Sequence, residues 1–181
     1  MRNKVDLRPL TSDDYKEIYE WSTNLSESFR WRFGGRTPSP EEFAHSLWIN
    51  VLAQYLVVDE NEEKQGLVVL YDADHVNGHV YIGFQGRPGG QSGIYATLGL
   101  LRLIDHAFRH WPFRKIYAEI PEYNMASFRS IVRRGMQVEG RLVSHIFYQD
   151  RYWDLITHSL TREIWAEVSQ IPFAAIFEKE T

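Results

Sequence analysis

The sequence contains no cysteine and only three methionines among its 181 residues. Without cysteine the chain forms no disulfide, offers no thiolate ligand to zinc and has no cysteine nucleophile. It also has no apolar run near the ~20 residues that a membrane-spanning helix requires. Met1–Leu10 mixes charged with apolar residues, unlike a secretory signal. These absences predict a cytoplasmic protein with no membrane partner.

The sequence also has little excess of one charge over the other, because 20 Lys and Arg residues are interspersed with 24 Asp and Glu residues. A nucleic-acid-binding domain usually presents a basic face, and only short basic clusters such as Arg129, Arg133 and Arg134 occur. We therefore predict no nucleic-acid partner. The His, Asp and Glu residues also lack the spacing of metal ligands, so no metal site is expected.

What the sequence does contain is an alternation of short apolar strands and amphipathic helices, which predicts a single domain over residues 1–181. The segments with the pattern of strands are 5–10, 54–59, 66–71, 79–84, 114–120, 137–148 and 152–160. The segments with helical spacing are 15–22, 40–51, 94–108, 124–134 and 162–170. This order predicts an α/β (α+β) fold, in which helices flank a mixed central sheet of about seven strands.

The most informative segment runs from Tyr81 to Ala96, where an apolar strand leads through a glycine-rich loop directly into an amphipathic helix. Such a connection points several backbone N–H groups and the positive end of a helix at one spot, which attracts phosphate. The loop lacks the Gly-Lys-Ser/Thr ending of a nucleotide-binding P-loop. The alternative is a plain loop-to-helix cap in which glycine only permits the turn.

A set of segments spread over most of the chain shares its order and spacing with one superfamily. The segments are Leu7–Asp14, Ile82–Phe84 followed by Gln91, Asn124–Ser127 with Gly135, and Arg151–Trp165. Together they resemble the GNAT superfamily of acetyl-CoA-dependent N-acetyltransferases, and within it the ribosomal-protein N-terminal acetyltransferase (RimJ/RimL-like) branch.

The resemblance implies the GNAT fold and acetyl-CoA as co-substrate. It also implies direct transfer of the acetyl group, in a ternary complex, to a primary amine. That amine belongs to a protein N-terminus or to a small molecule. The sequence leaves the oligomeric state open, and a homodimer is among the states it allows.

The resemblance assigns coenzyme A to two neighbouring stretches. The N–H groups of Gln91, Ser92, Gly93, Ile94, Tyr95 and Ala96 would hold the pyrophosphate. The backbone of Ile82, Gly83 and Phe84 would pair with the pantetheine arm, and one of its N–H groups would hold the thioester oxygen.

Asn124 has two readings, because it would either bond the pantetheine arm or only cap its helix. The phosphate loop departs from the family pattern at Ile94, where glycine is usual. A β-branched residue resists positive φ. This departure, together with the absence of a tyrosine acid from the helix after Asn124, supports an alternative function, a catalytically weak or inactive GNAT-fold module that binds acyl-CoA.

The resemblance also places the catalytic groups. Ser127 is the candidate acid that protonates the departing thiolate, since a serine at this place has that role in the branch; the alternative is a first-turn hydroxyl that only faces water. Ile131 stands in the helix where many relatives have a tyrosine acid. Glu119 is the candidate base for the substrate amine, since it faces away from the apolar side of its strand. Tyr117, His79 and Glu139 are weaker candidates for the base.

Acceptor recognition is expected from aromatic and basic residues near the first helices and the last strands. Trp31, Arg32 and Tyr152 are the residues we assign to acceptor binding. Arg30, Arg32 and Arg36 would either bind a carboxylate or phosphate on the acceptor or stay solvated.

Overall fold

The computed structural model describes residues 5–26, 28–30, 33–89 and 92–170. The strands are β1 (Val5–Pro9), β2 (Val51–Asp59), β3 (Lys64–Asp74), β4 (His79–Gly86), β5 (Lys115–Pro121), β6 (Gln137–Tyr148) and β7 (Arg151–Thr161). The α-helices are α1 (Tyr15–Thr23), α2 (Pro40–Ser46), α3 (Ser92–His110), α4 (Met125–Val132) and α5 (Arg162–Val168). Single 3₁₀ turns are η1 (Ser12–Asp14), η2 (Ser28–Arg30) and η3 (Glu122–Asn124).

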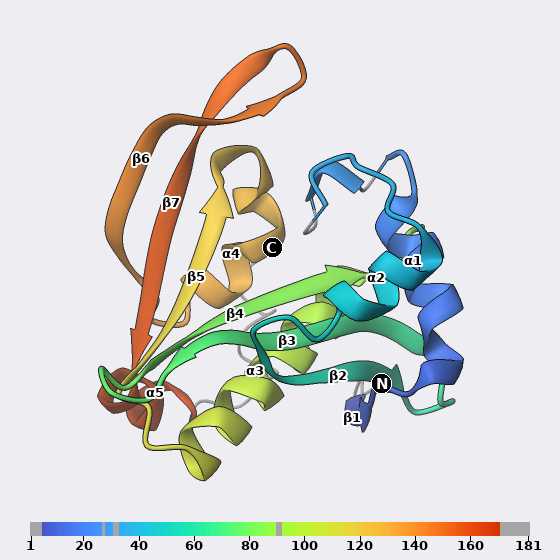
Figure 1. Cartoon of the computed structure of the whole chain (residues 1–181). Coiled ribbons are helices and arrows are strands. Elements are labelled where there is room, and N and C mark those ends of the chain that lie inside the picture. Colours follow the sequence, from blue (N-terminus) through green and yellow to red (C-terminus); the bar gives the residue numbers. More distant parts are fainter. Residues whose placement is uncertain (1–4, 27, 31–32, 90–91, 171–181) are drawn as a thin grey trace, which may run out of the picture. The chain divides into compact units, whose positions relative to one another are not determined.

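These strands form a seven-stranded sheet in the order β1-β2-β3-β4-β5-β7-β6 (Figure 1). Neighbours pair antiparallel at β1·β2, β2·β3, β5·β7 and β6·β7. β4 and β5 pair parallel, with His79–Tyr81 opposite Lys115–Tyr117. The predicted fold class is confirmed as a mixed α/β fold with an open seven-stranded sheet and flanking helices.

Two compact units make up the chain. The first contains the segments up to Ala73 and from Ile82 to Leu103, and the second contains Asp74–Tyr81 and the segments from Ile104 onward. The boundaries fall before the last residue of β3, within β4 and within α3. Each unit is described by itself below.

The first unit buries apolar side chains on both faces of its strands. On one face, Ile18 of α1 and Phe43 of α2 pack with Leu56 and Val58 of β2. The intervening residue, Val57, is also fully buried and faces α3. A Cβ atom placed on Gly99 of α3 would lie only 2.3 Å from Val57 Cγ2. The alternation along β2 therefore sets α1 and α2 against one face and α3 against the other.

A buried carboxylate ties the start of the first helical segment to two strands. Asp14 is only 3% exposed, and Arg8 Nη2 and Lys64 Nζ lie 2.7 Å and 3.0 Å from its Oδ1. The backbone N–H of Thr11 donates to its Oδ2 at 2.9 Å. Burial alone would raise the pKa of Asp14, but these hydrogen bonds outweigh burial and hold the pKa well below its usual range.

We expect Asp14→Asn to lower the free energy of unfolding by about 2 kcal/mol at pH 7, because it leaves two half-buried cationic donors, Arg8 and Lys64, with a weaker, uncharged acceptor. The folded-state pKa of Asp14 is depressed, so its stabilisation is fully present above about pH 4 and is lost as the pH falls below that value. The difference in the free energy of unfolding between the variant and the parent should therefore be smaller at pH 3 than at pH 7. Urea unfolding at both pH values measures it, with Asp13→Asn as the exposed control in the same turn. An equal difference at both pH values would contradict the assignment.

The second unit carries a long hairpin beside β5. Ile116, Ala118 and Ile120 of β5 are buried, whereas Glu119 on the opposite face is exposed, as the alternation predicted. β6 and β7 turn at Gln149 and Asp150, both with positive φ (51° and 59°). β6 pairs with β7 and is the last strand in the sheet order.

One predicted helix boundary was wrong, and one predicted cap was confirmed only in its position. The apolar stripe of the second helix was expected to include Val51, but α2 ends at Ser46 and Val51 begins β2. The chain turns between them at Asn50, whose φ is 56°. The apolar spacing continues past this turn, and the helix was therefore predicted to be too long. Asn124 does occupy the N-cap position of α4, but its side chain makes no capping hydrogen bond.

Candidate functional site

The first unit contains the junction that the sequence singled out, in which β4 is followed by α3. Ile82 is buried, and Gly83 and Phe84 are half-buried near the end of β4. α3 begins at Ser92, so the first N–H groups of a long helix come directly after the loop. Gln91 lies outside the described residues, and for Ser92 and Ala96 only the helical backbone is described.

The backbone at Gly93 and Ile94 tests whether the helix start suits a diphosphate. A Cβ atom on Gly93 would have no described atom within 4 Å. Ile94 lies inside α3 and is not among the residues with positive φ. A branched side chain there causes no backbone strain, so the conformational objection to isoleucine at this position does not apply. The donors present fit an anionic group at this helix start.

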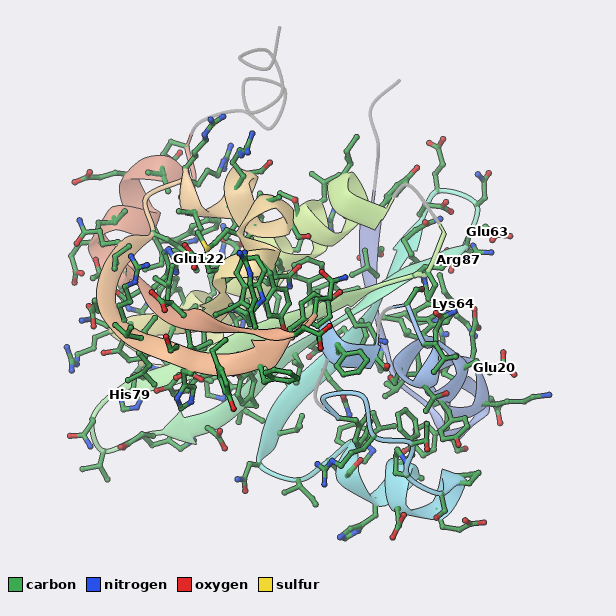
Figure 2. The ribbon with its side chains drawn as sticks, turned by 90° about the horizontal axis from the view of Figure 1, so that it is seen from above. Glu20, Glu63, Lys64, His79, Arg87 and Glu122 are labelled. Carbon is green, nitrogen blue, oxygen red and sulfur yellow. The ribbon has the colours of Figure 1, made fainter. Side chains whose placement is uncertain are left out.

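Arg87, a basic residue of this loop, is already paired. Arg87 follows β4 directly, and its Nη1 lies 3.0 Å from Glu63 Oε2 (Figure 2). Its backbone N–H donates to the carbonyl of Gln65 at 3.0 Å. Because Glu63 neutralises Arg87, the N–H groups of α3 are the better candidates for phosphate.

A buried polar pair beside this junction escaped the sequence analysis. Ser22 of α1 donates from its Oγ to Gln85 Oε1 of β4 at 3.0 Å, and both residues are buried. Gln85 Nε2 has no partner in the part of the chain that the structure describes. The available signal was a glutamine inside an otherwise apolar strand end.

The second unit contains the predicted catalytic residues. Glu119 near the end of β5 is exposed and stands opposite Thr157 of β7. The chain then passes through η3 into α4, which places half-buried Asn124 before the helix and exposed Ser127 in its first turn. An exposed hydroxyl and an exposed carboxylate are both accessible for proton transfer.

Glu139, a weaker candidate for the base, is engaged in a polar cluster. Its Oε1 accepts hydrogen bonds from Lys115 Nζ and, at 2.7 Å, from Ser159 Oγ. The Lys115 ammonium, followed by Ser159, lowers the pKa of Glu139. A carboxylate with a lowered pKa is a poorer proton acceptor, so Glu119 remains the better candidate.

Aromatic side chains gather where the hairpin meets η3, and Tyr123 among them was not foreseen. The Tyr123 ring lies 4.3 Å from that of Tyr148 and 5.6 Å from that of Trp153. The Arg151 guanidinium stacks on the Trp153 ring at 3.2 Å. The sequence offered one signal for Tyr123, which is that it directly precedes Asn124, a residue already assigned to the site.

The predicted acceptor residues are only partly described. Tyr152 of β7 is 64% exposed, and its ring meets Phe147 edge-on at 5.2 Å. Trp31 and Arg32 lie outside the described residues, and the side chain of Arg30 is not described. Arg36 donates from its Nε to the carbonyl of Phe33 at 3.3 Å and is exposed.

Two further properties bear on the class of site. Among the described residues, no cluster of three or more His, Asp or Glu side chains is arranged to hold a metal ion. Within the same residues, no helix has the length and apolar character needed to cross a bilayer.

Comparison with known proteins identifies a family for this arrangement. Residues 4–137 match a family described as the acetyltransferase (GNAT) domain. The sequence has no significant match among curated proteins.

Solved structures similar to this chain include spermidine N-acetyltransferase from Vibrio cholerae in complex with CoA and spermine. It has a TM-score of 0.78 and 21% identity over 90% of this chain and 98% of that chain. The spermidine/spermine N-acetyltransferase of the same organism in complex with manganese ions has a TM-score of 0.74 and 22% identity. It covers 92% of this chain and 98% of that one. At this identity the likeness shows the fold alone.

Proposed function

Because the chain belongs to the GNAT acetyltransferase family, we propose that it transfers the acetyl group of acetyl-CoA to a primary amine by direct attack in a ternary complex. The observation that carries the proposal is the junction in the first unit, where β4 leads through a glycine-rich loop into the N-terminus of α3. We assign the diphosphate of the coenzyme to the N–H groups of residues 91–96.

Acetyl-CoA supplies a thioester whose carbonyl carbon accepts the amine nitrogen. A backbone N–H of Ile82 or Gly83 donates to the thioester oxygen as negative charge grows on it, a contribution of about 3 kcal/mol in other oxyanion sites. Glu119 takes the proton that the amine loses when the C–N bond forms. Ser127 gives a proton to the sulfur as the C–S bond breaks and takes one from the surrounding water in its place, and Asn124 bonds the pantetheine amides.

We propose a small-molecule amine as the acceptor in preference to a protein N-terminus. The structural neighbours are acetyltransferases of spermidine and spermine, and the chain has a net charge of −4, which suits a cationic acceptor. The N-terminus of a protein, which the RimJ/RimL-like reading favours, is the alternative acceptor.

The test combines titration calorimetry with a thiol-release assay. We expect acetyl-CoA to bind and coenzyme A to be released when spermidine or spermine is added, with less release for a peptide that has a free N-terminus. Faster turnover of the peptide would contradict the small-molecule acceptor. Tight binding without turnover on any amine would favour the inactive binding module instead, and no binding of acetyl-CoA would overturn the proposal.

We expect Ser127→Ala to lower kcat about tenfold with little change in KM for acetyl-CoA. The loss is modest because a thiol with a pKa near 8.5 leaves as thiolate without much help. Steady-state kinetics measures it, with Ser130→Ala in the same helix as the matched control. An unchanged kcat in Ser127→Ala would remove the serine from the mechanism.

A further inference from the structure

The hairpin of the second unit continues past the strand that supports it. β5 pairs with β7 only as far as Pro121, which stands opposite Leu155. From there to the turn at Gln149 and Asp150, β6 and β7 pair only with each other in the described part of the chain (Figure 1). We call residues 142–155 the arm. A two-stranded hairpin by itself is only marginally stable in water, so the arm would gain stability from a further contact.

The arm exposes four large apolar residues. Val143 is 74% exposed, Phe147 58% and Tyr152 64%. Leu142, at the base of the arm, is 49% exposed. Phe147 and Tyr152 stand opposite each other on the two strands, and their rings meet edge-on at 5.2 Å. Single apolar residues on a surface need no explanation, but four on one short hairpin mark an interaction site.

The outer edge of β6 is open as well. β6 has 12 residues and is the last strand in the sheet order, so within the described residues only its edge toward β7 is paired. Edge strands are often short or carry lysine or proline, which discourage pairing with another chain, and β6 contains neither residue. Its register with β7 shifts between Leu142 and Ile146, where Asp154 Oδ1 accepts the Ser144 N–H at 2.8 Å. Because this bulge divides the edge, side-chain contacts rather than a continuous backbone ladder would hold a partner there.

The charges of the arm favour a second copy of the chain as that partner. Asp150 and Arg151 at its tip carry opposite charges, and Asp154 is paired with Arg141. The arm is therefore nearly neutral, whereas the whole chain has a net charge of −4. Two arms can meet without bringing like charges together, and a highly charged partner such as a nucleic acid finds no opposite charge to bind.

We propose that the arm is the contact between two copies of this chain in a two-fold symmetric dimer. In such a dimer the same surface of each copy faces the other, so one exposed cluster supplies both halves of the interface. The four apolar residues expose about 450 Å² per copy, so two arms would bury about 900 Å² of them, and the surrounding polar groups bring the contact to the ~1,000 Å² that a specific interface needs. An interface of this size predicts a reversible dimer.

The test is sedimentation velocity of the untagged full-length protein from micromolar to near-millimolar concentration. We expect the mass to rise from that of one chain to that of two, and high salt not to dissociate the dimer, because the contact is apolar. Val143→Glu and Phe147→Glu each place a charge in the contact, and each should weaken the dimer more than about tenfold. Tyr152 stays unchanged in this series because we assign it to acceptor binding.

Val76→Glu is the matched control, because Val76 lies between β3 and β4, outside the arm, and is 95% exposed. It adds the same charge and should dimerise like the parent, and circular dichroism confirms that each variant is folded. A parent that stays monomeric at every concentration, or that forms large assemblies of no defined size, would overturn the proposal. So would equal weakening in Val76→Glu, or undiminished dimers in both arm variants. The readout does not depend on acetyl transfer, so it stands or falls separately from the proposed function.

Discussion

Gly93→Asp should abolish tight coenzyme binding while leaving the protein at least as stable as before. An added carboxylate in the first turn of α3 repels the diphosphate. With two phosphate charges about 5 Å away and an effective dielectric of about 40, the cost is about 3 kcal/mol, or about 100-fold in affinity. The same carboxylate interacts favourably with the helix N-terminus, by about 0.3–1 kcal/mol. Titration calorimetry with acetyl-CoA and thermal unfolding measure the two effects.

The neutral variant Gly93→Asn is the matched control for this experiment. The two side chains have the same shape, and a Cβ atom at residue 93 has no described atom within 4 Å. We expect Gly93→Asn to retain most of the affinity for acetyl-CoA. If both variants lose affinity equally, steric exclusion explains the effect. If neither does, the start of α3 does not bind the diphosphate.

Gly99→Leu should lower the free energy of unfolding by more than about 3 kcal/mol, although leucine is the better helix former by about 0.8 kcal/mol. The reason is the contact between α3 and β2, where a Cβ atom would lie 2.3 Å from Val57 Cγ2. The helix must move away from the strand to admit any side chain. Urea unfolding measures the loss.

Two variants separate this packing effect from helix propensity. Gly93→Ala places the smallest side chain at an open position of the same helix, and it should leave stability unchanged or raised. Val57→Ala removes the methyl groups that the new side chain meets, so Gly99→Ala should cost less in the Val57→Ala background than in the parent. Additive losses would show that Val57 is not the cause.

Local pattern was sufficient for most of the secondary structure. The alternation of Tyr117 and Glu119 with the buried residues of β5 was read correctly, and the hairpin strand β6 has the predicted limits. The turn from β4 into α3 was also recognised, because glycines and an amphipathic run are adjacent in the chain. The end of α2 was missed because an apolar residue at the right spacing belonged to the next strand.

The candidate site was only partly accessible to the same reasoning. Glu119 was chosen from its place on the face of a strand, and Ser127 was chosen from the resemblance to the family. The engagement of Glu139 by Lys115, a residue 24 positions away, could not be read from the sequence. Neither could the bond between Ser22 and Gln85, which are 63 positions apart.

The sequence by itself determined the order of strands and helices, the glycine-rich start of α3 and the likeness to one family. These features depend on residues that are close together in the sequence, within one helical turn, one strand or one loop, so local spacing encodes them. Only the tertiary structure decided that β7 pairs with β5 while β6 takes the edge. It also decided which polar groups are already paired, such as Arg87 with Glu63. Contacts of this kind join residues that are distant in the chain, and no local pattern specifies them.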